Sequence, residues 1–176
     1  MKQVFLLAVF VFLACTAQIP PEQKSEVSEM AFSIRSPGFQ DKGNIPEKYT
    51  CQGDDINPSL IFVRVPANAK SIALIMDDPD APVGTWVHWL MWNIPVDANI
   101  DEDSVPLGAV QGKNSWGRND YGGPCPPSGT HRYFFRAYAL DTLLSLDESS
   151  GRAELEEAMQ GHIIAEFRII GLYRKS

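Results

Sequence analysis

Short apolar runs separated by turn residues make up most of the chain from residue 31 onward. The runs are rich in β-branched and aromatic residues and are bounded by Gly, Pro, Asn and Asp, which is the pattern of strands. Prolines, notably the cluster Pro124–Pro127, mark several of their ends. We therefore predict strands over Phe32–Ile34, Ser59–Val65, Ser71–Met76, Trp86–Ile94, His131–Leu140 and Ala165–Tyr173.

Only one segment predicts a helix. Arg152–Gln160 is rich in helix-forming residues, places Leu155 and Met159 at i, i+4, and is followed by Gly161, a residue that favours helix ends. Many strands with few helices indicate a mainly β fold with a sandwich or barrel-like core.

The N-terminus has the pattern of an export signal. Lys2 precedes an apolar run, Val4–Ala14, of roughly 11 residues, whereas a membrane-spanning helix needs about 20. We predict a signal peptide over residues 1–14 with lipidation at Cys15. Cleavage after Ala17 and a retained membrane anchor are the alternatives. Residues 15–29 are polar and predict a flexible tether, and residues 30–176 predict the folded domain.

Export also changes the interpretation of the cysteines. If Cys15 is consumed in processing, Cys51 and Cys125 remain as an even pair. Outside the cytoplasm such a pair can form a disulfide, although two independent buried thiols are the alternative. We expect the disulfide, and a location in the cell envelope, either lipid-anchored or secreted or periplasmic.

Length and charge narrow the class of partner. The chain has 176 residues, which suits one domain, and a net charge of −7 with no basic cluster. Nucleic acid is therefore not an expected partner, since phosphate backbones favour Lys and Arg stripes.

Two proline-rich turns each deliver a histidine near the start of an apolar run. Asp77–Pro82 leads to His88 within Trp86–Trp89, and Gly123–Pro127 leads to His131. Histidine changes charge near pH 7, and prolines restrict the turns that hold it.

These segments resemble the signature regions of the phosphatidylethanolamine-binding protein family, also called Raf kinase inhibitor-like. The family pattern is Asp-Pro-Asp-x-Pro before a His-Trp strand, then a Gly/Pro loop before Gly-x-His-Arg-Tyr, and Gly112–Gly123 resembles the loop of its bacterial and archaeal branch. The resemblance covers roughly Ala31 to Tyr173. It implies a large central antiparallel sheet packed on a smaller sheet with few peripheral helices.

The resemblance also implies a ligand pocket for a small anion or phosphorylated headgroup. Its residues would be Asp78, Asp80, His88, His131 and Tyr133, with Pro126 at the rim. In eukaryotic members a C-terminal helix also borders the pocket, and the sequence after Tyr173 predicts none, so a more open pocket is expected on that side.

Strand alternation assigns the side chains of these segments to faces. His131 and Tyr133 face one side, while Arg132 faces the other and is expected to be structural, pairing with Asp80. On the earlier strand, alternation places four side chains on one face: Trp86, His88, Leu90 and Trp92.

Carboxylates beside an anion should repel it. One explanation is that they hydrogen-bond the histidines and raise their pKa, and another is that the ligand carries its own proton or amine.

The bond between Ala81 and Pro82 is a candidate for a cis peptide.

An exported, non-catalytic binding protein is the function expected first. A protein-interaction module, such as an envelope protease inhibitor, is the alternative, and an unrecognised hydrolase is a third. The sequence has no Gly-x-Ser-x-Gly elbow, zinc motif or phosphate loop, so we expect neither an enzyme, a metal nor a cofactor. Prokaryotic family members are often dimers, so a homodimer is one expected assembly.

Overall fold

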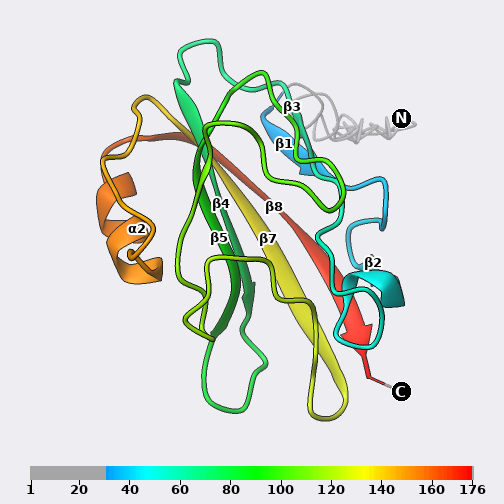
Figure 1. The fold of residues 1–176 in the computed structure, drawn as a ribbon. Helices are drawn as coiled ribbons and strands as arrows, with labels where there is room; N and C mark the ends of the chain where they lie inside the picture. Colours follow the sequence, from blue (N-terminus) through cyan, green and yellow to red (C-terminus); the bar gives the residue numbers. More distant parts are fainter. Residues whose placement is uncertain (1–30, 176) are drawn as a thin grey trace, which may run out of the picture. The chain divides into compact units, whose positions relative to one another are not determined.

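The computed structural model describes residues 31–175, which form two sheets (Figure 1). The larger sheet has six strands in the order β2-β8-β7-β4-β5-β6, and the smaller pairs β1 with β3. The bounds are β1 Ser33–Arg35, β2 Gly43–Asn44, η1 Glu47–Tyr49, β3 Ile61–Val63, β4 Ser71–Asp78, β5 Trp86–Ile94, β6 Val110–Gln111, β7 Thr130–Leu140, α2 Arg152–Met159 and β8 Ile163–Arg174. The predicted mainly β class, with a large and a small sheet, is confirmed.

The centre of the large sheet is β4. Every one of its residues is buried, and it pairs antiparallel with β5 on one side and β7 on the other. A strand buried on both faces cannot alternate apolar with polar residues, which explains its continuous apolar run. All pairs in this sheet are antiparallel except that of β2 with β8.

The large sheet buries a separate apolar cluster on each face. We call the inner face the one that carries Trp89, Tyr133 and Phe135 and packs with residues of β1 and β3. On the outer face, Leu155 and Met159 of α2 pack against side chains of β4 and β5. Figure 1 shows α2 on the β4–β5 side of the sheet and β1 beside β8.

A β-bulge in β5 changes which side chains share a face. Met76 pairs with Trp89, but the next residue, Asp77, pairs with Val87, so His88 is an extra residue in β5. A bulge inserts one residue and shifts the alternation of everything after it. The prediction that Leu90 and Trp92 share the face of His88 is therefore wrong, because both lie in the outer cluster.

Some of the other sequence predictions agree with the structure and others do not. The predicted strands and helix are present with shifted ends, whereas β2, β6 and η1 are too short to leave a periodic signal. The bond between Ala81 and Pro82, a candidate for a cis peptide, is trans, since residues 31–175 contain no cis peptide. No helix among the described residues is long and apolar enough to cross a membrane. The signal peptide, Cys15 and the tether lie outside the described residues.

Candidate functional site

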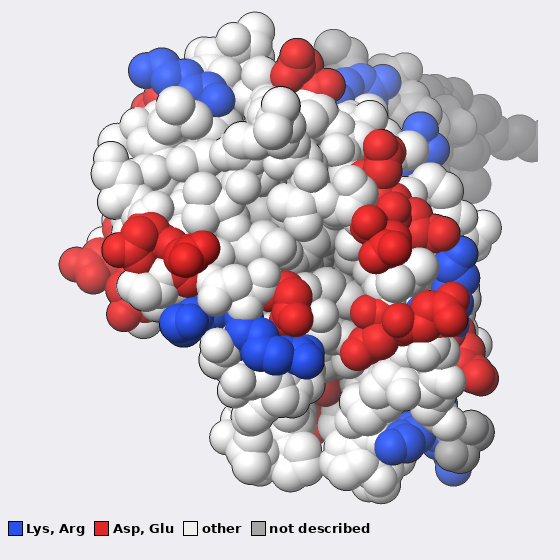
Figure 2. All heavy atoms as spheres, viewed as in Figure 1, with Lys and Arg blue, Asp and Glu red and all other residues white. Residues whose placement is uncertain are grey.

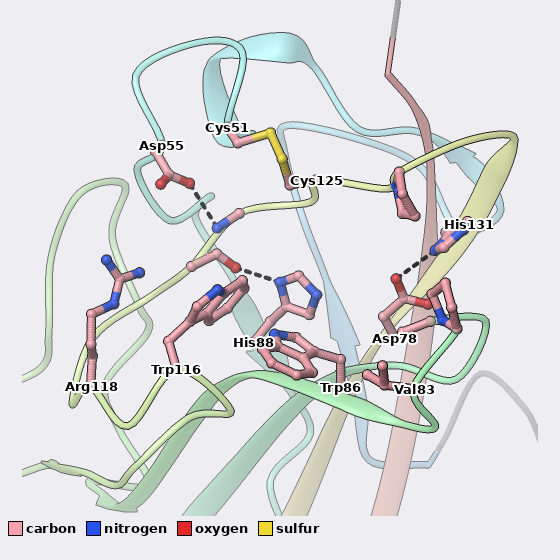
Figure 3. A pocket seen from close by; sticks show the side chains of 15 residues that line it. Cys51, Asp55, Asp78, Val83, Trp86, His88, Trp116, Arg118, Cys125 and His131 are labelled. Carbon is pink, nitrogen blue, oxygen red and sulfur yellow. Dashed lines mark hydrogen bonds and ion pairs between the residues drawn. A yellow bond between two sulfur atoms is a disulfide. The ribbon is translucent and has the colours of Figure 1, made fainter.

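A pocket of about 470 Å³ opens beyond the inner core, at the end of the sheet where β4 stops and β7 begins. Figure 2 shows the molecule hollowed between the loop that follows β4 and the loop that precedes β7, and Figure 3 shows the side chains around the pocket. The lining residues are Cys51, Asp55, Asp78, Ala81, Pro82, Val83, Trp86, His88, Trp116, Arg118, Gly122, Gly123, Cys125, Pro127 and His131.

His88 forms the floor of the pocket because the bulge turns it inward. Its Nδ1 lies 2.7 Å from the carbonyl oxygen of Gly122, so this nitrogen carries the proton of the neutral ring. The ring packs edge-on against Trp116 and Tyr133, with centroids 5.0 and 5.2 Å away. Burial lowers the pKa of His88, although the carbonyl of Gly122 and the charge of Asp78 act in the opposite direction. Of the two explanations for carboxylates beside an anion, the one in which they raise the histidine pKa therefore does not hold for His88.

His131 and Asp78 form the opposite wall. Asp78 ends β4 and His131 begins β7, and Nδ1 of the histidine lies 2.8 Å from Oδ2 of the carboxylate. Both side chains are less than 10% exposed. The carboxylate fixes the ring orientation and places the second ring nitrogen, Nε2, away from the pair. Figure 3 shows this pair facing His88 across the pocket.

Tyr133 lies behind the histidines rather than on the pocket surface. It is fully buried and contacts the ring of His88. Its pKa is raised, first by burial and second by the negative charge of Asp78, so the hydroxyl stays a neutral donor. Neither this hydroxyl nor Nε1 of Trp86 has a hydrogen-bond partner among residues 31–175. Unpaired buried donors are costly, and of these two only Nε1 of Trp86 belongs to a residue that lines the pocket, where a polar ligand could satisfy it.

Asp80 and Pro126 are not among the residues that line the pocket. Asp80 is engaged elsewhere, accepting hydrogen bonds from Nε and Nη2 of Arg132 at 2.9 and 2.6 Å. The predicted pairing of these two residues is therefore present, and the guanidinium lowers the pKa of Asp80. The Asp80 backbone N–H donates to Asp78 Oδ1 at 2.8 Å, so the turn also orients the wall carboxylate. Pro126 lies between two lining residues, Cys125 and Pro127.

The predicted disulfide is present and crosses the rim of the pocket (Figure 3). It joins Cys51, just after η1, to Cys125 in the proline loop, and the two residues are 74 positions apart in sequence. The backbone N–H of Cys51 also donates to the carbonyl oxygen of Pro124 at 3.2 Å. The loop that precedes His131 is thereby fixed to a distant part of the chain.

Sequence reasoning did not assign Trp116, Arg118 and Asp55 to the pocket, although all of them line it. Trp116 packs on His88, and the guanidinium of Arg118 lies 5.5 Å from the Trp116 ring centroid and pairs with Asp120. Trp116 and Arg118 lie within the segment already recognised as typical of the bacterial and archaeal branch. Single residues in irregular loops leave no periodic signal, so only that resemblance could have pointed to them.

Two consecutive glycines let this loop approach the site. A Cβ on Gly122 would lie 2.5 Å from an atom of the Trp116 ring, so a side chain there would displace the indole. A Cβ on Gly123 would lie 2.4 Å from Oδ1 of Asp55, which accepts the Gly123 N–H at 2.7 Å. Both positions therefore require glycine for close backbone approach.

The lining combines charges of both signs. Asp55 and Asp78 supply carboxylates, His88 and His131 supply imidazoles, and Arg118 supplies a guanidinium at the edge. The lining holds no Ser, Thr or Lys, and its two cysteines are bonded to each other. No group of three or more His, Cys, Asp or Glu among residues 31–175 is arranged to hold a metal ion.

Comparison with known proteins gives a consistent result. The sequence profile described as "Phosphatidylethanolamine-binding protein" matches residues 35–174. The chain is 50% identical over 149 residues to the "UPF0098 protein" of Methanothermobacter thermautotrophicus, with 81% of this chain and 99% of that protein covered. It is 45% identical to a UPF0098 protein of Chlamydia trachomatis, with 85% and 99% covered.

Two solved structures are similar throughout the domain. The homologue CT736 from Chlamydia trachomatis has a TM-score of 0.81 and 44% identity, with 84% of this chain and 99% of that chain covered. YBCL of E. coli, described as a member of the mammalian PEBP family, has a TM-score of 0.77 and 31% identity, with 82% and 99% covered. The chain therefore belongs to the phosphatidylethanolamine-binding protein family.

Proposed function

We propose that the protein is a non-catalytic, extracytoplasmic binding protein whose pocket takes a small phosphorylated headgroup that also carries a cationic group. The observation that carries this proposal is the arrangement of His88 opposite the His131–Asp78 pair in one pocket. The two imidazoles offer their Nε2 atoms to the phosphate, and the carboxylates of Asp55 and Asp78 offer acceptors to the cation.

Burial of His88 limits the protonation state in which a phosphate can bind. Because its pKa is lowered and Nδ1 donates to Gly122, the neutral ring presents Nε2 as an acceptor. A phosphate dianion has no proton to give to that nitrogen, so binding requires either a protonated phosphate or protonation of His88. Complex formation should therefore take up a proton near neutral pH, and affinity should fall as pH rises.

The two carboxylates favour a zwitterion over a simple anion. Asp55 already accepts the Gly123 N–H, and Asp78 already pairs with His131, so each keeps negative charge close to the pocket. Such charge repels phosphate unless the ligand supplies a compensating cation. Phosphoethanolamine has both groups and fits the volume available, which makes it the appropriate first probe.

The non-catalytic part of the proposal rests on the composition of the lining. Covalent catalysis uses a hydroxyl, thiol, amine, carboxylate or imidazole as its nucleophile. The described lining has no Ser, Thr or Lys, its cysteines are bonded to each other, and its carboxylates already accept hydrogen bonds from Gly123 N–H and His131. The disulfide supports the extracytoplasmic part, because structural disulfides persist in oxidising compartments.

Isothermal titration calorimetry tests the proposal with phosphoethanolamine and inorganic phosphate as probes. Phosphoethanolamine should bind more tightly, and both His88→Gln and His131→Gln should weaken it by about tenfold or more, as expected for lost hydrogen bonds to a charged ligand. Titration in buffers of different ionisation enthalpy should reveal proton uptake.

His162→Gln provides the matched control, because His162 is a surface histidine that pairs with Asp141 and does not line the pocket. Equal affinity for the two probes, or unchanged binding in both pocket variants, would contradict the headgroup assignment. Turnover of a phosphoester that is lost in His131→Gln would contradict the non-catalytic assignment.

A further inference from the structure

The outer face of β7 and β8 carries a group of charged side chains that does not belong to the headgroup pocket. Residues of the two strands that pair in register lie on the same face, and here Arg136 is directly opposite Arg168. Like charges in directly opposed positions repel, with Cβ atoms about 5 Å apart. The sheet therefore places two guanidiniums side by side where a pair of opposite charges would be more stable.

Both guanidiniums pack against one aromatic ring. The guanidinium carbons of Arg136 and Arg168 lie 4.6 and 5.3 Å from the ring centroid of Phe134, and that of Arg132 lies 5.6 Å away. Phe134 is only 7% exposed. Stacking on a ring holds a guanidinium plane in a defined orientation, which lowers the entropy lost when it binds an oxyanion.

The arginines of this face differ in how far carboxylates neutralise them. Arg132 pairs with Asp80, and Arg152 pairs with both Asp77 and Glu156. Arg136 uses only its Nε toward the buried Asp77, at 3.2 Å from Oδ2. Among the carboxylates of residues 31–175, none forms an ion pair with Arg168. The terminal nitrogens of Arg136 and the whole guanidinium of Arg168 thus remain available.

These two arginines line a groove of about 500 Å³, together with Tyr138, Glu166 and Phe167. Burial raises the pKa of Tyr138, although the charge of Arg136 opposes this, so the phenol stays protonated. The groove therefore offers two guanidiniums and a phenol within one concave volume, and the carboxylate of Glu166 lies opposite Tyr138, one pair along the same face from the two arginines. None of its lining residues also lines the headgroup pocket.

We propose that this groove is a second binding site, in which Arg136 and Arg168 together hold the oxyanion of a small ligand that has an apolar or aromatic body. The planar fork of each guanidinium matches the oxygen spacing of phosphate and carboxylate groups. The phenol of Tyr138, which lies on the same face as the two arginines, contacts the body of the ligand. An oxyanion between the arginines also removes the repulsion that their register imposes.

Phenyl phosphate and benzoate are the probes, because they share an aromatic body and differ in the oxyanion. Titration of the His131→Gln protein, followed by the Nε–Hε signals of arginine in NMR spectra, reports this groove while binding at the headgroup pocket is weakened. At least one probe should shift the signals of Arg136 and Arg168 together, and Arg168→Gln should weaken its binding about tenfold. The probe that binds more tightly identifies the class of oxyanion.

Arg35→Gln is the matched control, because Arg35 is an exposed arginine of β1 that does not line the groove. Arg168→Lys should keep only part of the affinity, since an ammonium lacks the planar fork. The proposal is overturned if neither probe moves the Arg168 signal, or if Arg168→Gln binds as tightly as the parent. Both outcomes are read from arginine signals in the His131→Gln protein, whose headgroup pocket is already impaired. A failure of this proposal can therefore be told apart from a failure of the headgroup assignment.

Discussion

His88 donates from Nδ1 to the carbonyl oxygen of Gly122 across 2.7 Å, while burial lowers the pKa of the same ring. In the unfolded chain the pKa of a histidine is about 6.5. Below that pH the unfolded state binds more protons at this position than the folded state. The contribution of His88 to stability is therefore complete above the unfolded pKa and is lost as pH falls through the lower folded pKa.

We expect urea unfolding between about pH 8 and pH 5 to show a loss of stability on the acid side that becomes smaller in His88→Gln. Gln keeps a polar side chain but cannot gain the proton. His162→Gln, the exposed control, should retain the parental dependence. An unchanged pH dependence in His88→Gln would show that His88 is not the group responsible.

Gly122→Ala should destabilise the protein, because the new Cβ would lie 2.5 Å from the Trp116 ring. Overpacking of this kind costs about 1–3 kcal/mol of unfolding free energy. The same change in a Trp116→Ala background should cost much less, which a double-mutant cycle in urea measures. Equal costs in the two backgrounds would mean that the indole is not the obstacle.

Loss of the disulfide should reduce stability by about 2–5 kcal/mol, since it closes a long loop in the unfolded chain. Its cysteines lie 74 positions apart, at Cys51 and Cys125. The double variant Cys51→Ser/Cys125→Ser is compared with the parent by guanidinium unfolding, with and without reductant. The parent should respond to reductant and the variant should not. Headgroup affinity should also fall, because the rim loop loses its attachment.

Two ion pairs on β4 and its following turn should differ in strength because they differ in burial. Asp77 is 1% exposed and binds both Arg136 and Arg152, so Asp77→Asn should cost about 3 kcal/mol. The Asp80–Arg132 pair is far more exposed, at 28% and 52%, so Asp80→Asn should cost much less than Asp77→Asn. Similar losses in the two variants, measured by urea unfolding, would contradict this ranking.

Much of the fold was predictable from apolar runs. The strands that became β4, β5, β7 and β8 are long enough for periodicity and turn residues to mark them. The short strands β2 and β6 have two residues each, and their pairing is set by tertiary contacts rather than by sequence pattern. The bulge could not be predicted from the sequence either, because an extra residue in a strand does not change the local composition.

The site was predictable in part because it depends on residues that two proline turns deliver. His88, His131 and Asp78 were identified, and the structure brings all three to one pocket. Trp116 and Asp55 were missed, because each reaches the pocket from a loop whose position depends on the whole fold. The lowered pKa of His88 could not be predicted, since its main cause is burial and burial cannot be judged from sequence.

Because of the bulge, the side chains of β5 alternate between the two faces of the sheet with one phase up to His88 and the opposite phase just after it. Up to His88, even-numbered residues such as Trp86 face the pocket, whereas from Trp89 to Met91 the odd-numbered residues face the inner core, before a second register shift returns Ile94 to that core. A scan of every substitution along the strand should therefore show a periodic tolerance whose phase inverts at this point. Changes before the inversion alter what the pocket accepts, and changes after it alter packing, so the two halves of one strand can diverge independently.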